Sequence, residues 1–105
     1  MNDDMNDLLK DAQTVLDRWF ATCLVYAGYE LVSIKPTGDK RFEFTILCPQ
    51  LDFESLKRDF HSGQMTIADA KALGNTNGSV GRIVNDVRQT GQTYLNPDFE
   101  RLQRN

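Results

Sequence analysis

The sequence predicts an α+β domain in which a long N-terminal helix packs on an antiparallel β-hairpin and two further helices follow. Three observations lead to this prediction: an apolar stripe at helical spacing near the N-terminus, strict alternation of apolar and polar residues in mid-chain, and a turn-like segment with proline and glycine before it. With 105 residues, 40% of them hydrophobic, the chain is long enough for one core without disulfides or metal ions. We expect a single domain over residues 1–95, with residues 96–105 as a C-terminal tail or short helix.

Apolar residues recur every three or four positions near the N-terminus, as they do on one face of a helix. The stripe consists of Leu8, Ala12, Val15, Leu16, Trp19, Phe20, Cys23, Leu24 and Ala27. Gly28 follows at the position where helices commonly end in a left-handed residue. We therefore expect a helix over residues 6–27.

Two segments in the middle of the chain have the composition of strands. Residues 41–48 alternate between apolar and polar side chains, and residues 29–34 are rich in aromatic and branched residues. The connection between them, residues 35–40, contains a proline and a glycine, which favour a tight turn. We expect an antiparallel hairpin whose apolar face, with Phe42 and Phe44, is buried under the first helix.

A second helix is expected after the hairpin, where Asp52 is placed to cap it and Gly63 to end it. Its apolar face carries Phe53, Leu56 and Phe60. For the next segment the sequence leaves two alternatives open. Residues 65–67 form a third strand at the sheet edge, or Thr66 and Asp69 begin a helical turn that runs to residue 73.

Residues 74–81 are the most glycine-rich stretch of the chain, and apolar residues at helical spacing follow it. A last helix is expected from Ser79 to about Thr90. The glycine-rich stretch fits a linker, an interrupted helix or an anion site made by the amides of residues 78–81 with Arg82. It lacks the spacing of a P-loop or a dinucleotide-binding turn, and the sequence leaves the three alternatives open.

No catalytic or metal-binding arrangement is recognisable in the sequence. His61 is the single histidine, and its expected place near a helix end gives it a structural role through the helix dipole. Cys23 and Cys48 are far from His61 and from each other in sequence, unlike most metal ligands. We expect no enzyme activity, no cofactor and no metal, with both cysteines reduced and buried.

The composition also limits the possible partners. The net charge is -3, and no apolar run approaches the roughly 20 residues that span a bilayer. No secretion signal is recognisable, so a cytoplasmic protein without membrane association is expected. Mild acidic charge, missing catalytic residues and exposed hairpin edges favour a small non-enzymatic accessory protein, a protein-interaction module that also forms a homodimer.

The alternative function is a nucleic-acid-binding module. Its candidate residues lie on the second and last helices and form one basic patch only if these helices pack side by side. They are Lys57, Arg58, Arg82 and Arg88. Nucleic acid is the less favoured partner, because acidic residues are interleaved with these cations.

Three segments carry a resemblance to known sequences: residues 16–31, in which an apolar helix passes through Gly-Tyr into a strand, the Phe-Glu-Phe strand of residues 41–44, and residues 60–63, in which an aromatic precedes Ser-Gly. In these features the chain resembles a family of small uncharacterised domains of bacteriophages and bacteria. The resemblance implies the fold and a phage or prophage origin, and it implies no activity. The chain departs from that family in the glycine-rich segment after Leu73 and in its acidic N-terminus.

Overall fold

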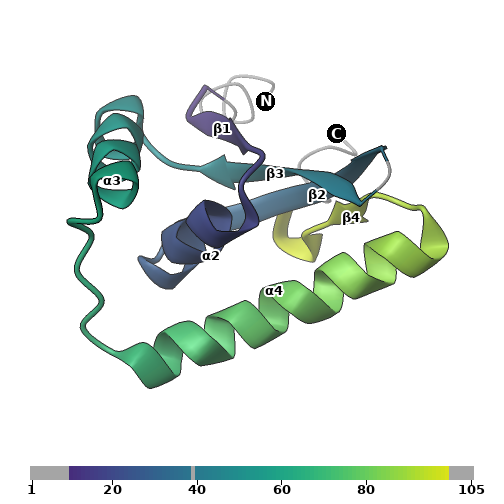
Figure 1. The fold of residues 1–105 in the computed structure, drawn as a ribbon. Helices are drawn as coiled ribbons and strands as arrows, with labels where there is room; N and C mark the ends of the chain where they lie inside the picture. The colour runs from purple at the N-terminus through teal and green to yellow at the C-terminus, as the bar shows by residue number, and fades with distance from the viewer. Residues whose placement is uncertain (1–9, 39, 100–105) are drawn as a thin grey trace.

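A four-stranded antiparallel sheet, in the order β1-β3-β2-β4, forms the centre of the computed structural model, which describes residues 10–38 and 40–99. α2 packs on β3, α4 packs on β2, and the two helices contact each other, whereas α3 lies at the β1 end (Figure 1). The α+β class is confirmed. The elements are β1 (Ala12–Val15), α2 (Arg18–Tyr26), β2 (Glu30–Gly38), β3 (Arg41–Leu47), α3 (Gln50–Ser62), α4 (Ala70–Thr90) and β4 (Tyr94–Leu95).

The long N-terminal helix expected over residues 6–27 is wrong, because the first described element is a strand. β1 pairs with β3 from Ala12 opposite Leu47 to Val15 opposite Phe44. Pairing satisfies backbone amides and carbonyls of a largely buried central strand, and this gain outweighs the helical periodicity of the segment. The first four residues of that expected helix, residues 6–9, lie outside the described part of the chain.

Asp17 is the N-cap at which α2 begins. Its carboxylate accepts hydrogen bonds from the amides of Trp19 and Phe20, at 2.8 and 3.1 Å. Because the helix starts only at Arg18, Leu16 precedes it, and Trp19 lies on its first turn outside the buried face. Leu16 is 71% exposed and Trp19 is 56% exposed, so neither belongs to the core as expected.

The β-hairpin is confirmed, and both strands lie close to the expected positions. β2 and β3 pair antiparallel, with Ile34 opposite Phe44, and β2 is longer than expected. Phe44 is 1% exposed, as predicted, whereas Phe42 is only partly buried at the rim of the core. The largest fully buried side chains are those of Leu24, Thr22, Ile34, Phe44, Ile46 and Cys48.

The second helix, α3, is confirmed with one correction at its start. Gly63 ends it in the left-handed conformation, with a φ of 76°. Its apolar face packs on the core through Phe53, Leu56 and Phe60. Asp52 is not the cap, since Pro49 occupies that position; the Asp52 carboxylate instead accepts a hydrogen bond from the Tyr29 hydroxyl at 3.1 Å.

α4 runs without interruption through the glycine-rich segment. Asp69 caps it by accepting a hydrogen bond from the Ala72 amide at 3.0 Å. The expected start at Ser79 is therefore wrong, and residues 74–81 are neither a linker nor a break. Burial explains the difference, because tertiary packing stabilises a helix whose own propensity is low. The buried stripe that anchors α4 is Val80, Val84 and Val87.

The remaining strands of the sheet differ from the expectation as well. Residues 65–67 form no strand, and the strand at the far edge is β4, which pairs with β2 at Ser33 and Ile34. The Asn96 amide donates to the Val32 carbonyl at 2.8 Å, which fixes the chain to β2. A single helical turn over residues 97–99 follows.

Candidate functional site

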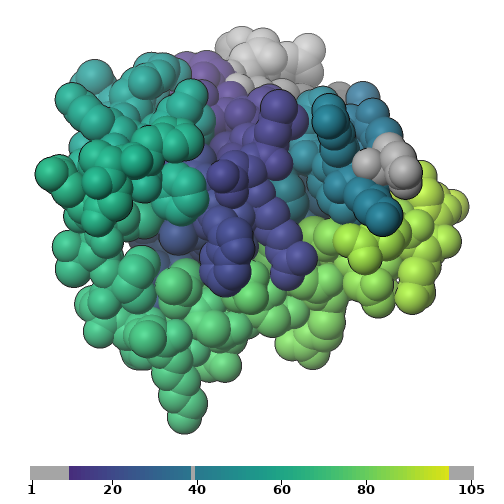
Figure 2. Space-filling view, in the orientation of Figure 1, coloured from purple at the N-terminus to yellow at the C-terminus, as the bar shows by residue number. Residues whose placement is uncertain are grey.

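A hollow of about 640 Å³ lies where the end of the β-hairpin, the start of α2 and the C-terminal half of α4 come together. In the space-filling view the surfaces of these three elements meet on one face of the molecule (Figure 2). We call it the cationic hollow, because four exposed basic side chains line it: Arg18, Lys40, Arg41 and Arg88. Its apolar lining is formed by Leu16, Phe42, Phe44 and Val84.

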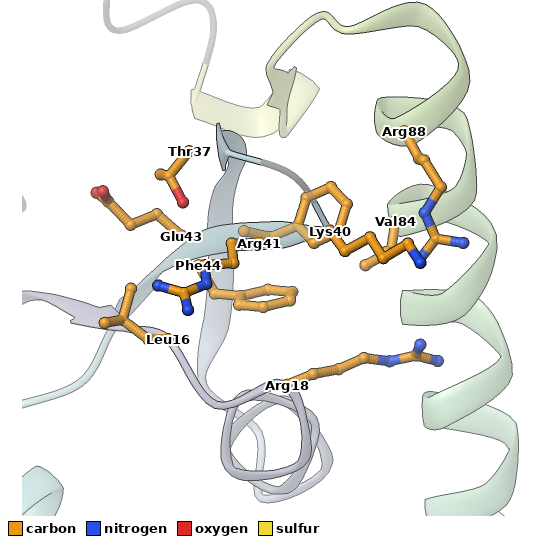
Figure 3. A pocket seen from close by; sticks show the side chains of 10 residues that line it. Leu16, Arg18, Thr37, Lys40, Arg41, Glu43, Phe44, Val84 and Arg88 are labelled. Atoms are coloured by element: carbon orange, nitrogen blue, oxygen red, sulfur yellow. The ribbon is translucent and has the colours of Figure 1, made fainter.

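The four cations come from four different elements. Arg18 is the first residue of α2, Lys40 lies in the hairpin turn, Arg41 begins β3 and Arg88 lies in the last turn of α4. Glu43 also lines the hollow, but its carboxylate is directed away from Lys40 and Arg88 (Figure 3). The hollow is thus a local excess of positive charge on a chain whose net charge is -3.

The Arg18 side chain lies against α4. Its Nη2 atom makes a long hydrogen bond of 3.5 Å to Oδ1 of Asn77. A Cβ atom at Gly81 would lie 2.9 Å from the same Nη2 atom, so a larger residue at this position would make the end of the flexible Arg18 side chain shift. Gly81 is the glycine of α4 that lies under the Arg18 side chain, whereas a Cβ at Gly74 or Gly78 would meet nothing within 4 Å.

Arg88 is held by an aromatic side chain. Its Cζ atom lies 5.9 Å from the centre of the Phe42 ring, within the range of a cation–π interaction. This contact places the guanidinium group beside the Phe42 ring at the edge of the hollow.

An unpaired stretch of strand edge lies inside the cationic hollow. β1 ends at Val15, opposite Phe44, so within the described part of the chain β3 has no strand partner on that side over residues 41–43. The Cys48 amide donates to the Asp11 carbonyl at 2.9 Å, so the backbone groups of Cys48 point toward β1. In an antiparallel strand the backbone groups of successive residues point to alternate sides, so those of Ile46 and Phe44 point toward β1 as well. By this alternation the amide and carbonyl of Phe42 face the hollow.

The structure separates the four residues expected to bind nucleic acid. α3 and α4 do not pack side by side, so the basic patch that required this packing does not form (Figure 1). Lys57 and Arg58 line a shallow depression on α3. Arg82 is exposed on α4 and does not line either hollow, and Arg88 is the one of the four in the cationic hollow.

Sequence reasoning missed Arg18, Lys40 and Arg41. They are 22 positions or more from one another or from Arg88, apart from the adjacent pair at the hairpin turn. That basic pair beside a turn was the one local signal available. These side chains line one hollow because β1 pairs with β3 and ends at Val15. No local sequence pattern specifies that pairing.

The buried cysteines offer no reactive group. Cys23 and Cys48 are free and buried, as expected. Burial raises the pKa of both thiols, and the charge of Asp17 adds to this at Cys23 and that of Asp52 at Cys48. Both groups are therefore protonated at neutral pH and weakly nucleophilic.

Over residues 10–38 and 40–99, no group of three or more histidine, cysteine or acidic residues comes together in a way that would hold a metal ion. Over the same residues no helix has the length and apolarity needed to span a membrane. His61 lies in the last turn of α3, exposed, with its ring 5.5 Å from that of Phe60.

Comparison with models of protein families, with curated proteins and with solved structures finds no match. The resemblance to phage and bacterial domains, and the origin that it implies, therefore stays a prediction.

Proposed function

We propose that this chain is a non-enzymatic protein-interaction module that binds an extended, acidic segment of a partner protein in the cationic hollow. The observation that carries the proposal is the unpaired β3 edge at residues 41–43, which lies among four cations. An extended peptide pairs its backbone with such an edge. Acidic side chains of the same peptide then reach the surrounding guanidinium and ammonium groups.

Exposed apolar side chains beside the hollow support a protein partner. Leu16 lines the hollow and Trp19 follows Arg18 on the first turn of α2, and both are more than half exposed. Large apolar side chains next to charged ones are typical anchors of protein interfaces, because their burial contributes most of the binding energy. We expect the partner segment to cover Leu16 and to approach Trp19.

The unpaired edge also favours a polypeptide over nucleic acid. A nucleic-acid backbone offers no alternating amides and carbonyls that extend a β-sheet, whereas phosphates need a continuous basic track. Of the candidate cations that do not line the hollow, Lys57 and Arg58 lie on α3 rather than along such a track. Nucleic-acid binding is therefore the competing outcome of the test.

The test uses a synthetic peptide of alternating glutamate and leucine that contains no tryptophan. Trp19 is the single tryptophan of the chain, so its fluorescence reports binding at α2. We expect Arg88→Glu to weaken binding about tenfold or more. The matched control is Arg82→Glu, which makes the same charge change on the same helix outside the hollow and leaves the affinity nearly unchanged.

Two results would contradict the proposal. Equal losses in the two variants would mean that net charge, and not the hollow, determines binding. Tighter binding of a single-stranded oligonucleotide than of the peptide would favour the nucleic-acid function. The homodimer expected from the sequence stays a prediction, and sedimentation of the free chain tests it.

A further inference from the structure

The unpaired edge of β3 has opposite charges at its two ends. Its three residues, 41–43, read Arg-Phe-Glu, and Val15 already lies opposite the next residue, Phe44. A partner strand therefore has room to pair with three residues of this edge. Arg41 lies next to the hairpin turn, whereas Glu43 lies next to the end of β1. Each end of the edge thus favours a different side chain in the partner.

Side chains alternate along a strand, which places these three residues on two faces of the sheet. Phe42 lies on the same face as Phe44, which is the face of the core, and the Cζ atom of Arg88 lies 5.9 Å from the centre of its ring. Arg41 and Glu43 lie on the opposite face. Figure 3 shows both of their side chains extending away from Arg88. The edge therefore has one position beside Arg88, between two positions on the other face.

The direction of the partner strand follows from the position of β1. A partner that continues the line of β1 runs antiparallel to β3, as β1 itself does. All strand pairs of the described sheet are antiparallel, and parallel pairing is slightly less stable per residue. In this direction the first paired residue of the partner lies opposite Glu43, the second opposite Phe42 and the third opposite Arg41.

The first and third positions are the ones at which charge has the largest effect. Because Phe42 directs its amide and carbonyl to the hollow, the residues opposite Arg41 and Glu43 belong to non-hydrogen-bonded pairs. Side chains approach most closely in such pairs, so opposite charges stabilise them and like charges destabilise them. β2 shows this complementarity on the other side of β3, where Lys35 lies opposite Glu43. A carboxylate has two oxygens and accepts hydrogen bonds from both sides.

We propose that the part of the partner segment that pairs with β3 consists of one basic residue followed by two acidic residues, in the order Lys-Glu-Glu. This inference rests on the proposed function and names the order of charges in the segment. The basic residue lies opposite Glu43, the first acidic residue lies beside Arg88, and the second lies opposite Arg41. Glu43 and Arg41 thus determine the register and direction of the segment by charge complementarity.

The experiment compares three peptides without tryptophan that differ only in their central residues, which read Lys-Glu-Glu, Glu-Glu-Lys or Glu-Glu-Glu. Affinities are measured by Trp19 fluorescence and by calorimetry at physiological ionic strength, where long-range attraction is screened. The first two peptides have the same composition and net charge, so they differ in the order of charges alone. We expect Lys-Glu-Glu to bind about tenfold more tightly than Glu-Glu-Lys. It should also bind more tightly than Glu-Glu-Glu, although that peptide is more acidic.

Variants of Glu43 test the residue that selects the first position. Glu43→Lys is expected to reverse the preference, so that Glu-Glu-Glu binds more tightly than Lys-Glu-Glu. Glu43→Gln avoids a like-charge pair with Lys35 and is expected to lose the preference for Lys-Glu-Glu over Glu-Glu-Glu. Glu30→Lys is the matched control, because it makes the same charge change at the end of β2 remote from the hairpin turn. It should keep the preference for Lys-Glu-Glu, and circular dichroism checks that each variant is folded.

The outcomes separate this inference from the proposed function. If neither these peptides nor the glutamate–leucine peptide binds, the proposed function is wrong and the inference falls with it. If only the glutamate–leucine peptide binds, or if Lys-Glu-Glu and Glu-Glu-Lys bind equally well, the inference alone is overturned. Tighter binding of Glu-Glu-Lys would indicate a parallel partner strand and overturn it as well. A folded Glu43→Gln chain that keeps the full preference for Lys-Glu-Glu over Glu-Glu-Glu also overturns it.

Discussion

Replacing Gly74 and Gly78 by alanine is expected to stabilise the protein, because both residues lie inside α4. Each substitution gains about 1 kcal/mol from the higher helix propensity of alanine. A Cβ at either position meets nothing within 4 Å, and neither residue has a positive φ, so no clash or strain offsets the gain. The double variant should gain about 2 kcal/mol, which corresponds to a rise in Tm of roughly 8–16 °C for a domain of this size.

Urea and thermal unfolding followed by circular dichroism measure both quantities. Gly91→Ala is the control, since Gly91 ends the same helix with a φ of 70°, and alanine there should lower the free energy of unfolding by about 1 kcal/mol. If residues 74–81 formed a loop or a broken helix in solution, the two alanines would gain nothing. An unchanged or lowered Tm of the double variant would therefore refute the continuous α4.

Three further predictions concern the cap, the core and the thiols. Asp17→Ala removes the carboxylate that caps α2 and should lower the free energy of unfolding by about 1 kcal/mol in urea, whereas Asp86→Ala, on the exposed side of α4, should change it little. Phe44→Ala leaves a cavity at the centre of the core and should lower the free energy of unfolding by about 3–5 kcal/mol. A loss below about 1 kcal/mol would place Phe44 outside the core. Because the pKa of Cys23 and of Cys48 is raised in the folded state, the unfolded state loses these protons first as the pH rises past the ordinary thiol value of about 8.5. Stability should therefore be complete below that pH and fall above it, with a shallower fall in Cys48→Ala, and a stability that rises with pH in this range would contradict the account.

The elements that could be predicted from the sequence are those whose signals are local. Alternation in residues 41–48 and the glycine at position 63 identified β3 and the end of α3, because strand periodicity and a left-handed cap depend on neighbouring residues alone. Residues 12–16 fit a helical stripe equally well, and the competing partner, the edge of β3, is some 30 residues away. Local periodicity does not contain that information.

The same limit explains the incomplete prediction of the site. Arg88 was identified as a candidate, but it was grouped with Lys57 and Arg58 on the assumption that two helices pack together. In the structure α4 packs on α2 and β2 instead, which brings Arg88 to Arg18 and the hairpin turn. Three of the cations belong to elements whose neighbours are determined by the sheet order, so the cationic hollow becomes visible only once that order is known.

Backbone amide shifts of the chain, recorded by NMR while the glutamate–leucine peptide is added, test the central claim most directly. The account predicts that the largest changes occur at residues 41–43 and at Gly81, and that the Phe42 amide becomes protected from hydrogen exchange. Changes confined to α3 around Lys57 and Arg58, or an unprotected Phe42 amide at saturating peptide, would contradict it.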